Sequence, residues 1–432
     1  MPRVVLQAPI LAAFRWRESM ETLVAGLNEQ QRKAVTAPVD RPVLVLAGAG
    51  CGKTTVLVRR IAWLLQLEYR PDSILALTFT RKAAGEMKER VSALRGESKG
   101  TAPLVTTFHG LGHRILHETI ADAPNYTRLG FACAPDLLGE RERLELLAAV
   151  TERRERQCLG LDLLRLDSLL EKTMVRPEAA SGFDSGRREL LERIRARMYR
   201  RCRENNKWTF ADMMVGTLEL FDRCSDVARY YAERFDVLLV DEFQDTSPVQ
   251  IRLLHSLFGP RKHLFAVGDD DQAIYGFRGA DTGPILHFSS HFPRAQVVKL
   301  EVNYRSTPAI LKAANRIFRD KPKGYRKTLR AGCAETPGMR PSVRRFASQA
   351  AMLQWVLRTV RGLVAGGLES EQIALLFRLN ESLHWAREYV ERAWPNGPEP
   401  RLMTIHGSKG LEFAVVFLCD LEEGFLPNYR LG

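Results

Sequence analysis

The chain has 432 residues, 45% of them hydrophobic, which predicts a globular protein of two or three domains, each able to bury its own core. Its 64 Lys and Arg residues exceed its 51 Asp and Glu residues, giving a net charge of +13 that favours a polyanionic partner, although charge alone does not choose between DNA, RNA and a membrane surface. The seven cysteines form no CxxC pair, so we exclude a disulfide framework and a structural zinc site and expect a cytoplasmic protein. No apolar run reaches the roughly 20 residues that would cross a bilayer, so we also exclude a membrane span.

Residues 1–20 are predicted to be an N-terminal extension. Their apolar stretch follows Arg3 and superficially resembles a signal peptide, but Gln7 and Pro9 interrupt it and no clear cleavage site follows. We therefore expect an extension of the folded chain rather than a secretory leader.

Short apolar runs predict parallel β-strands that end at ligand-binding loops. They are rich in leucine and β-branched residues, and each of the first four ends in Gly, Thr or Asp where a strand would meet its loop, the edge at which doubly wound sheets bind ligands. These four runs are RPVLVLAGAG at 41–50, DSILALTFT at 72–80, FDVLLVDEFQDT at 235–246 and HLFAVGDDDQ at 263–272. After Val302, the runs QIALLFRLN and RLMTIHGSKGLEFAVVFLCD predict a second α/β domain.

Residues 111–207 differ from the stretches on either side, because their pattern is long, charged and helical. The segment GRRELLERIRARMYRRCRENNK at 186–207 places arginines on two faces of a helix. This pattern predicts an inserted helical subdomain with a basic surface. A ligand-binding surface and a solvated helix without a ligand explain these arginines about equally well.

A glycine-rich loop, LVLAGAGCGKTTVL at 44–57, joins a predicted strand to a predicted helix. In such a loop the backbone N–H groups and the helix N-terminus converge on one anion site. Lys53 adds a charge for the β- and γ-phosphates of a nucleotide, and the Thr54 hydroxyl can bind Mg²⁺. The pattern GxxxxGK[ST] asks for glycine where Ala47 stands, but three glycines remain. A turn without a nucleotide is the alternative, which the preceding strand disfavours.

A pair of acids follows another predicted strand, in VLLVDEFQD. A phosphate-binding loop needs a carboxylate from a neighbouring strand for the metal, and Asp241 has that place. Glu242 would orient or deprotonate the attacking water. Adjacent acids are often only a helix cap or a solvated turn, but together with Lys53 they predict an NTPase.

Several stretches resemble, in order and over nearly the whole chain, the UvrD/Rep/PcrA group of superfamily 1A DNA helicases. These stretches are LNEQQRKAV, AGAGCGKTT, TFTRKAAGEM, TFHGLGHRIL, DEFQDTSPVQ, VGDDDQAIYGFRGAD, LEVNYRSTPAIL and MTIHGSKGLEF. The family's phosphate-binding loop also has alanine at the position of Ala47. The resemblance implies an α/β fold of two RecA-like P-loop NTPase domains, with parallel sheets and helices on both faces, plus an inserted helical subdomain.

The resemblance also implies which residues contact ATP and Mg²⁺. Gln31 would hydrogen-bond the adenine, and Tyr304 would pack on it. Gln272 would sense the γ-phosphate, Arg305 would reach it across a domain cleft, and Glu412 would lie near the ribose. The loop residues implied at the phosphates are Gly48, Ala49, Gly50, Cys51, Gly52, Lys53, Thr54 and Thr55.

A second set of residues is implied at single-stranded DNA. Arg81 stands where the family usually has asparagine, and Phe277 replaces the more usual tryptophan. Stacking of bases on aromatic rings is worth about 1–3 kcal/mol per base and tolerates any sequence, as a translocating motor requires. The residues of this set are Phe79, Arg81, Thr107, His109, Tyr275, Phe277 and His406.

The domain organisation implied by the resemblance divides the chain into five segments. We expect an extension at 1–20, domain 1A in two parts at 21–110 and 208–299, a 1B-like helical insert at 111–207, and domain 2A at 300–432. Only Glu381 to Leu402 separates the two runs between which the family has a large 2B subdomain, so 2B is expected to be essentially absent. The chain also ends before the family's last motif, which carries an arginine for the γ-phosphate.

The expected function is an ATP-driven helicase and translocase that steps 3′ to 5′ on single-stranded DNA, binds junctions of single and double strands, and serves repair, replication or plasmid- and phage-related DNA processing. The reduced 2B and the absent last motif favour an alternative: a nucleotide-gated single-strand-binding subunit whose partner protein supplies regulation or a catalytic arginine. An RNA-directed or signalling NTPase is disfavoured by the aromatic coupling segment and by TIHGSKGLEF.

Overall fold

The computed structural model describes residues 21–95, 101–120, 123–259, 262–276, 282–319, 324–332, 338–395 and 399–423. The chain forms two compact units, residues 1–339 and residues 340–432. The predicted extension at 1–20 and the predicted DNA contact Phe277 lie outside the described residues.

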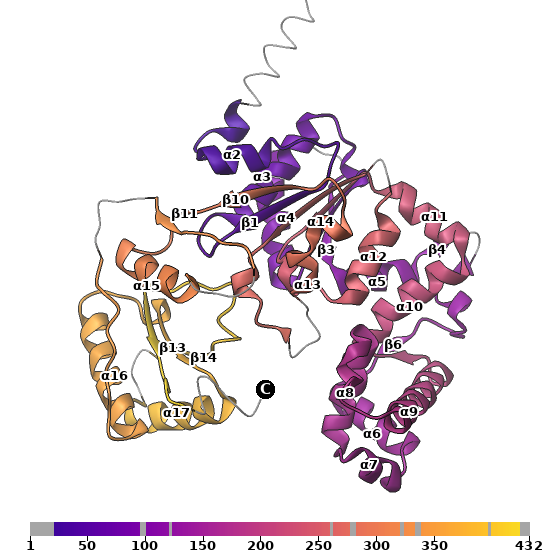
Figure 1. Ribbon diagram of the computed structural model, residues 1–432. Helices are drawn as coiled ribbons and strands as arrows, with labels where there is room; N and C mark the ends of the chain where they lie inside the picture. The colour runs from indigo at the N-terminus through magenta and orange to yellow at the C-terminus, as the bar shows by residue number, and fades with distance from the viewer. Residues whose placement is uncertain are drawn as a thin grey trace, which may run out of the picture. The chain divides into compact units, whose positions relative to one another are not determined.

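The first unit is built on a six-stranded, fully parallel sheet with the order β10-β1-β9-β8-β2-β3 (Figure 1). The four strands expected in this part of the chain are confirmed, and each is buried along its length. Near-continuous burial is typical of parallel strands that are covered on both faces. The strands are β1 (Val43–Ala47), β2 (Ile74–Thr78), β3 (Leu104–Thr107), β8 (Val237–Val240), β9 (His263–Gly268) and β10 (Gln296–Leu300).

Helices cover both faces of this sheet, as expected for a RecA-like domain. Alternate residues of β1 enter different cores, because successive side chains of a strand point to opposite faces: Val45 packs in one core and Leu46 in the other. One core receives α2 (Glu29–Val35), α3 (Lys53–Gln66) and α4 (Arg81–Arg95). The other receives α5 (Phe108–His117), α10 (Phe210–Arg223), α11 (Ser225–Arg234), α12 (Pro248–Leu257), α13 (Gly283–Leu286) and α14 (Phe288–His291).

The helical insert has a small core of its own, made by α6 (Glu140–Val150), α7 (Arg153–Leu159), α8 (Leu163–Val175) and α9 (Ser185–Glu204) (Figure 1). This core runs from Leu138 to Cys202, which is shorter than the expected range 111–207. Leu111 and Phe131, which lie inside that range, pack in the core of the main sheet instead, as does Trp208 just beyond it. The bounds of the insert stay a prediction.

The arginines of α9 divide into two groups. Arg197 forms an ion pair with Glu155 at 2.7 Å, and Arg203 pairs with Glu219 at 3.0 Å, so these two arginines hold the insert together and join it to α10. Arg188 and Arg200 are exposed. Part of the arginine pattern is therefore explained by folding alone.

The segment that follows β10 packs in the first unit. A short parallel pair joins β11 (Val302–Asn303) to β12 (Arg330–Ala331), with α15 (Pro308–Phe318) between them. We expected this segment to open the second RecA-like domain, at residue 300. The boundary at 300 stays a prediction, while the compact units divide after Met339.

The second unit contains a parallel three-stranded sheet with the order β14-β13-β15. Its strands are β13 (Ile373–Phe377), β14 (Arg401–Thr404) and β15 (Val415–Leu418), and its helices are α16 (Gln349–Ala365) and α17 (Asn380–Ala393). Between β13 and β14, the described residues contain one helix, α17, and no larger helical subdomain. The absence of a 2B subdomain from the protein stays a prediction. Within the described ranges, no helix has the length and hydropathy of a membrane span.

One buried cation ties α2 to the sheet. Arg60 of α3 has no exposed surface and donates hydrogen bonds to the carbonyl oxygens of Val35 and Ala37, at 2.8 and 2.6 Å. Its guanidinium also lies 2.9 Å from Nε2 of His263, which must accept, while Nδ1–H of His263 donates to the carbonyl oxygen of Arg41 at 3.0 Å. Burial, and then the charge of Arg60, lower the pKa of His263 to about 3.

We predict that His263 makes the folded chain sensitive to acid. In the unfolded chain its pKa returns near 6.5, so protons bind the unfolded state first and the free energy of unfolding falls as the pH drops from 6.5 towards 3. Between pH 7 and pH 5 this histidine should account for a loss of about 2 kcal/mol. Urea unfolding of the wild type and of His263→Gln at both pH values measures it. Equal losses in the two proteins would contradict the prediction.

Candidate nucleotide and DNA site

The phosphate-binding loop follows β1 and opens α3. Gly50 and Gly52 have left-handed backbone conformations, with φ of +70° and +86°, which L-residues with a side chain adopt at a cost. Helix α3 begins at Lys53, and the residue before it, Gly52, provides no side-chain cap. The first N–H groups of α3 are therefore left for a bound anion, as in phosphate-binding loops.

The loop is tightly enclosed by residues that follow β10. A Cβ on Gly50 would lie 2.6 Å from Cβ of Arg305 and 2.7 Å from Nδ2 of Asn303. Asn303 is buried, donates from Nδ2 to the carbonyl oxygen of Ala49 at 2.5 Å, and accepts from the backbone N–H of Arg305 at 2.9 Å. The backbone N–H of Tyr304 donates to the carbonyl oxygen of Gly50 at 2.9 Å. The predicted residues Tyr304 and Arg305 thus lie directly beside the predicted phosphate loop.

Lys53 and Glu242 form a bidentate ion pair. Nζ of Lys53 lies 2.9 and 3.0 Å from the two carboxylate oxygens of Glu242. Burial opposes the charge of Lys53, but the carboxylates of Glu242 and Asp241 outweigh it, so the pKa of Lys53 lies above its usual value. The predicted phosphate-binding lysine and the predicted water-activating carboxylate therefore meet across the sheet edge, with Lys53 charged.

The backbone at Glu242 is held in an uncommon conformation. Its φ is +50°, which is rare for a residue that is not glycine and is found where the surrounding structure enforces it, as in active sites. Its N–H donates to Oδ1 of Asp241 at 2.9 Å, and Asp241 is 8% exposed. The left-handed turn brings both carboxylates to the end of β8.

The predicted adenine side of the site is formed by α2. Gln31 donates from Nε2 to the carbonyl oxygen of Cys51 at 3.1 Å and closes a capping box with Asn28. Nδ2 of Asn28 donates to the hydroxyl of Tyr304 at 2.8 Å, and Tyr304 is 53% exposed. Gln31 and Tyr304 therefore flank the loop on the same side.

Gln272 lies in the loop after β9. It donates from Nε2 to Oδ2 of Asp269 at 2.5 Å. The backbone N–H of Asp269 donates to Oε1 of Gln244 at 2.8 Å, and Nε2 of Gln244 donates to Glu242. A chain of hydrogen bonds therefore runs from Gln272 to the Lys53–Glu242 pair.

Two of the residues predicted at DNA stack on each other. The rings of Phe79, which follows β2, and Tyr275, which follows β9, have centroids 5.1 Å apart and planes 15° apart. Arg81 is exposed at the first position of α4, two residues after Phe79.

A second pair of predicted residues lies at the start of α5. Thr107 caps this helix, because its hydroxyl accepts from the N–H of Gly110 at 3.0 Å. The ring of His109 packs edge-on against Phe210, with centroids 5.6 Å apart, and burial lowers the pKa of His109. His109 is thus neutral at pH 7 and offers an imidazole N–H rather than a charge. Phe210 is 43% exposed and extends this surface.

The remaining predicted residues lie in the second unit. His406 follows β14, and the N–H of its neighbour Gly407 donates to Oγ1 of Thr404 at 3.1 Å. Glu412 is exposed and lies before β15.

Comparison with known proteins decides the family. Residues 27–293 match the model of the UvrD/REP helicase N-terminal domain, and residues 298–393 and 395–431 match that of the UvrD-like helicase C-terminal domain. The chain belongs to the UvrD/Rep helicase family. The first match ends at residue 293 and the second begins at residue 298.

Individual members of the UvrD/Rep family are moderately similar to this chain. DNA helicase II of Escherichia coli is 38% identical over 302 residues, which are 68% of this chain and 41% of that protein. The ATP-dependent DNA helicase PcrA of Bacillus subtilis is 34% identical over 380 residues, which are 87% of this chain and 50% of that protein. The chain thus matches half or less of the length of these relatives.

Three residues of this UvrD/Rep-type site were missed at the sequence level. Asn303 stands in the quoted stretch LEVNYRSTPAIL, and Gln244 stands in DEFQDTSPVQ. Each side-chain amide bonds the backbone of a residue far away in the sequence, and no pattern of neighbouring residues predicts such a bond. Phe210 is one exposed aromatic in an amphipathic helix, which is usually a core pattern. Thr209, a typical helix-capping residue, indicates that Phe210 is the first residue of the helix rather than an interior one.

We predict that an alanine at Gly50 is costlier than one at Gly26. Both glycines have left-handed φ, +70° and +74°, so Gly26→Ala should lower the free energy of unfolding by about 1 kcal/mol. No atom lies within 4 Å of a Cβ at Gly26, whereas Asn303 and Arg305 confine Gly50, which adds about 1–3 kcal/mol. Guanidinium unfolding of both variants measures the difference. Equal losses would show that the contact between the loop and Asn303 is loose.

Proposed function

We propose that this chain is an ATP-dependent DNA motor that moves on single-stranded DNA. The observation that carries the proposal is the position of the Lys53–Glu242 pair in the same sheet-edge region as the stack of Phe79 on Tyr275. Membership of the UvrD/Rep family supports it, as do relatives named DNA helicase II and ATP-dependent DNA helicase PcrA.

The side chains at the sheet edge fit ATP with Mg²⁺. A threonine hydroxyl and a carboxylate are the hard oxygen ligands that Mg²⁺ accepts, and Thr54 and Asp241 would hold it. When bound, the ion would neutralise charge on the phosphates. The loop from Gly48 to Thr55 would bind the phosphate oxygens through its backbone N–H groups.

Glu242 changes its partner in this proposal. Where Lys53 turns from Glu242 to the β- and γ-phosphates, the Glu242 carboxylate loses its counter-charge and becomes available to accept a proton from the attacking water. The enforced φ at Glu242 and its bond from Gln244 keep the carboxylate in place during this exchange. The ion pair thus restrains the base until phosphate is bound.

Further residues would recognise the nucleotide. Gln31 would hydrogen-bond the adenine and Tyr304 would stack on it, with Glu412 near the ribose. Gln272 and Arg305 would contact the γ-phosphate, where a guanidinium is worth a factor of about 10³–10⁵ in rate. In this proposal residues 300–432 form the second RecA-like domain.

Single-stranded DNA would lie along the aromatic residues at the sheet edge and in the second domain. Phe79 and Tyr275 would stack on bases, while Arg81 and the exposed Phe210 would extend the contact. Hydrolysis would drive stepping 3′ to 5′ towards a junction with duplex DNA. The others proposed on the strand are Thr107, His109, Phe277 and His406.

We predict that Lys53→Ala and Glu242→Gln each abolish ATP hydrolysis stimulated by single-stranded DNA. Glu242→Gln should lower the rate by a factor of about 10²–10⁴ while ATP still binds, because the amide removes the proton acceptor and keeps the shape. Lys53→Ala should also weaken ATP binding. Steady-state hydrolysis with and without oligo-dT, together with binding of a fluorescent ATP analogue, measures both effects.

Matched controls are Lys88→Ala and Glu89→Gln, which change exposed residues of α4 and should hydrolyse ATP like the wild type. ATP-dependent binding of oligo-dT without turnover in the wild type would favour the alternative, a nucleotide-gated subunit that needs a partner. Absence of any ATP binding would contradict the proposal.

We also predict that Phe79→Ala and Tyr275→Ala each weaken binding of oligo-dT by about 1–3 kcal/mol, and leave ATP binding without DNA unchanged. Because the two rings touch, the double variant should lose less than the sum of the single losses. Fluorescence anisotropy of labelled oligo-dT measures the affinities. Tyr230→Ala, an exposed tyrosine on α11, is the control. Wild-type affinity in both single variants would exclude this pair from the DNA site.

A further inference from the structure

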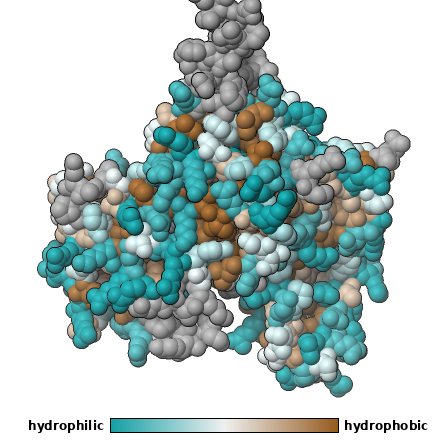
Figure 2. All heavy atoms as spheres, turned by 45° about the horizontal axis from the view of Figure 1, so that its top comes forward, coloured by the Kyte–Doolittle hydropathy of each residue, from teal (hydrophilic) through white to brown (hydrophobic). Residues whose placement is uncertain are grey.

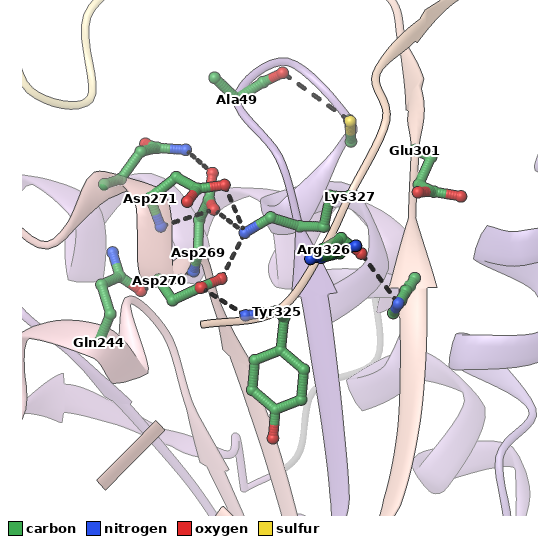
Figure 3. Close-up of polar contacts among 12 residues, drawn as sticks. Ala49, Gln244, Asp269, Asp270, Asp271, Glu301, Tyr325, Arg326 and Lys327 are labelled. Carbon is green, nitrogen blue, oxygen red and sulfur yellow. Dashed lines mark hydrogen bonds and ion pairs between the residues drawn. The ribbon is translucent and has the colours of Figure 1, made fainter. Parts of the chain in front are cut away.

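An internal lysine lies among three consecutive aspartates in the loop after β9. Nζ of Lys327 contacts the carboxylates of Asp269, Asp270 and Asp271, at 2.5 Å from Asp270 and 3.1 Å from Asp271 (Figure 3). Only 3% of the Lys327 side chain is exposed. The ammonium is thus a structural counter-ion enclosed by protein rather than a solvated charge.

The cluster depends on this cation. One oxygen from each of the three aspartates lies within 4.8 Å of the others, so the carboxylates repel one another unless a positive charge stands between them. Burial opposes the charge on Lys327, but Asp269 and Asp270 outweigh it and raise its pKa above the usual value. The lysine therefore stays protonated and holds the three carboxylates together.

Asp269 connects Lys327 to the proposed ATP site. One carboxylate oxygen of Asp269 accepts from Lys327 (Figure 3). The other accepts from Nε2 of Gln272, and the backbone N–H of Asp269 donates to Gln244. Gln244 in turn donates to Glu242. The positions of Gln272 and Glu242 therefore depend on how Asp269 is held.

The same loop leads to the proposed DNA contact. Tyr275 stands three residues after Gln272 and stacks on Phe79. The aspartate run is the base of this loop, and Lys327 is its anchor. The buried ammonium of Lys327 thus holds the aspartate run that precedes both Gln272, the proposed ATP-sensing residue, and Tyr275, the proposed DNA contact.

Lys327 is itself held firmly, because neighbouring residues of its segment are bonded to different elements. The N–H of Tyr325 donates to Oδ2 of Asp270 at 2.9 Å, and the N–H of Thr328 donates to Oε1 of Glu301 at 2.8 Å. The side chain of Leu329 covers Gly48 of the phosphate loop. The anchor is therefore fixed to Glu301, which follows the edge strand β10, and to the loop that would bind ATP.

We propose that Lys327 is a positioning residue that couples the ATP site to the DNA site, by fixing the Asp269–Asp271 run from which Gln272, Glu242 and Tyr275 are oriented. The inference rests on the proposed function, since it concerns the efficiency of that reaction. It assigns a role to a lysine that follows α15 and belongs to none of the motifs quoted above.

The test uses a charge-balanced variant. Lys327→Met alone leaves three buried carboxylates without a cation and endangers folding, whereas Lys327→Met combined with Asp271→Asn keeps the net charge of the cluster unchanged. Lys262→Met is the control, because Lys262 is a partly buried lysine whose Nζ donates to a backbone carbonyl oxygen, that of Phe235. Lys327→Arg keeps the cation and serves as the conservative variant.

For each protein, kcat and KM for ATP are measured with and without saturating oligo-dT, beside the melting temperature. We expect the double variant to lose DNA stimulation, with kcat in the presence of oligo-dT about 10- to 100-fold lower and KM changed less than about threefold. Lys327→Arg should recover most of kcat, and Lys262→Met should keep it. A purely structural role would instead lower the melting temperature and leave the ratio of kcat with DNA to kcat without it intact.

A folded double variant with wild-type stimulation by oligo-dT would overturn the inference and leave the proposed function standing. A wild type that hydrolyses no ATP with oligo-dT would overturn both, because no coupled reaction would exist for Lys327 to support. The wild-type measurement therefore separates the two failures.

Discussion

The parallel direction of β1, β8 and β9 is the constraint on which the whole site depends. Strands that run the same way end at the same edge, so the loops after them are neighbours even though residues 47, 240 and 268 are far apart in the chain. Lys53, Glu242 and Asp269 each follow one of these strands within six residues. Burial of the apolar strands thus fixes the positions of Lys53, Glu242 and Asp269, although these polar residues are not part of the hydrophobic core.

Buried cations recur in this fold, and each has a different kind of partner. Arg60 is bonded to backbone carbonyls and a neutral histidine, Lys53 to one carboxylate, and Lys327 to three. A buried charge is tolerated only where its partners offset the loss of water. The bonds of Arg60 join α2 to the sheet, and those of Lys327 hold the loop after β9. In the proposed function, Lys53 exchanges its carboxylate for the phosphates of ATP. Hydrophilic residues cover much of the molecular face shown in Figure 2, with hydrophobic residues exposed near its centre.

Much of the fold could be predicted from the sequence, because its signals are local. The runs before Gly48, Phe79, Asp241 and Asp269 are apolar and end at a glycine, threonine or aspartate, and all four are strands of the parallel sheet. The bounds of the insert stay a prediction. A helix can be charged on one side and pack on the main core with the other, as α5 does through Leu111.

The candidate site could be predicted only in part, for a physical reason. Lys53, Asp241 and Glu242 stand in patterns whose spacing reflects one loop or turn. Lys327 and Asn303 act through contacts with residues more than 50 positions away, and a lysine or an asparagine in a polar stretch has no distinguishing neighbours. The roles of the predicted residues stay predictions, whereas their proximity within the first unit is a property of the fold.

The stack of Phe79 on Tyr275 has a mechanical consequence. Two rings with centroids 5.1 Å apart leave no room for a third between them, so a base could enter only by parting them. Work done in opening the pair would be returned when the base leaves and the rings meet again. In the proposed function, contact between the two rings would therefore oppose the entry of a base between them and assist its departure.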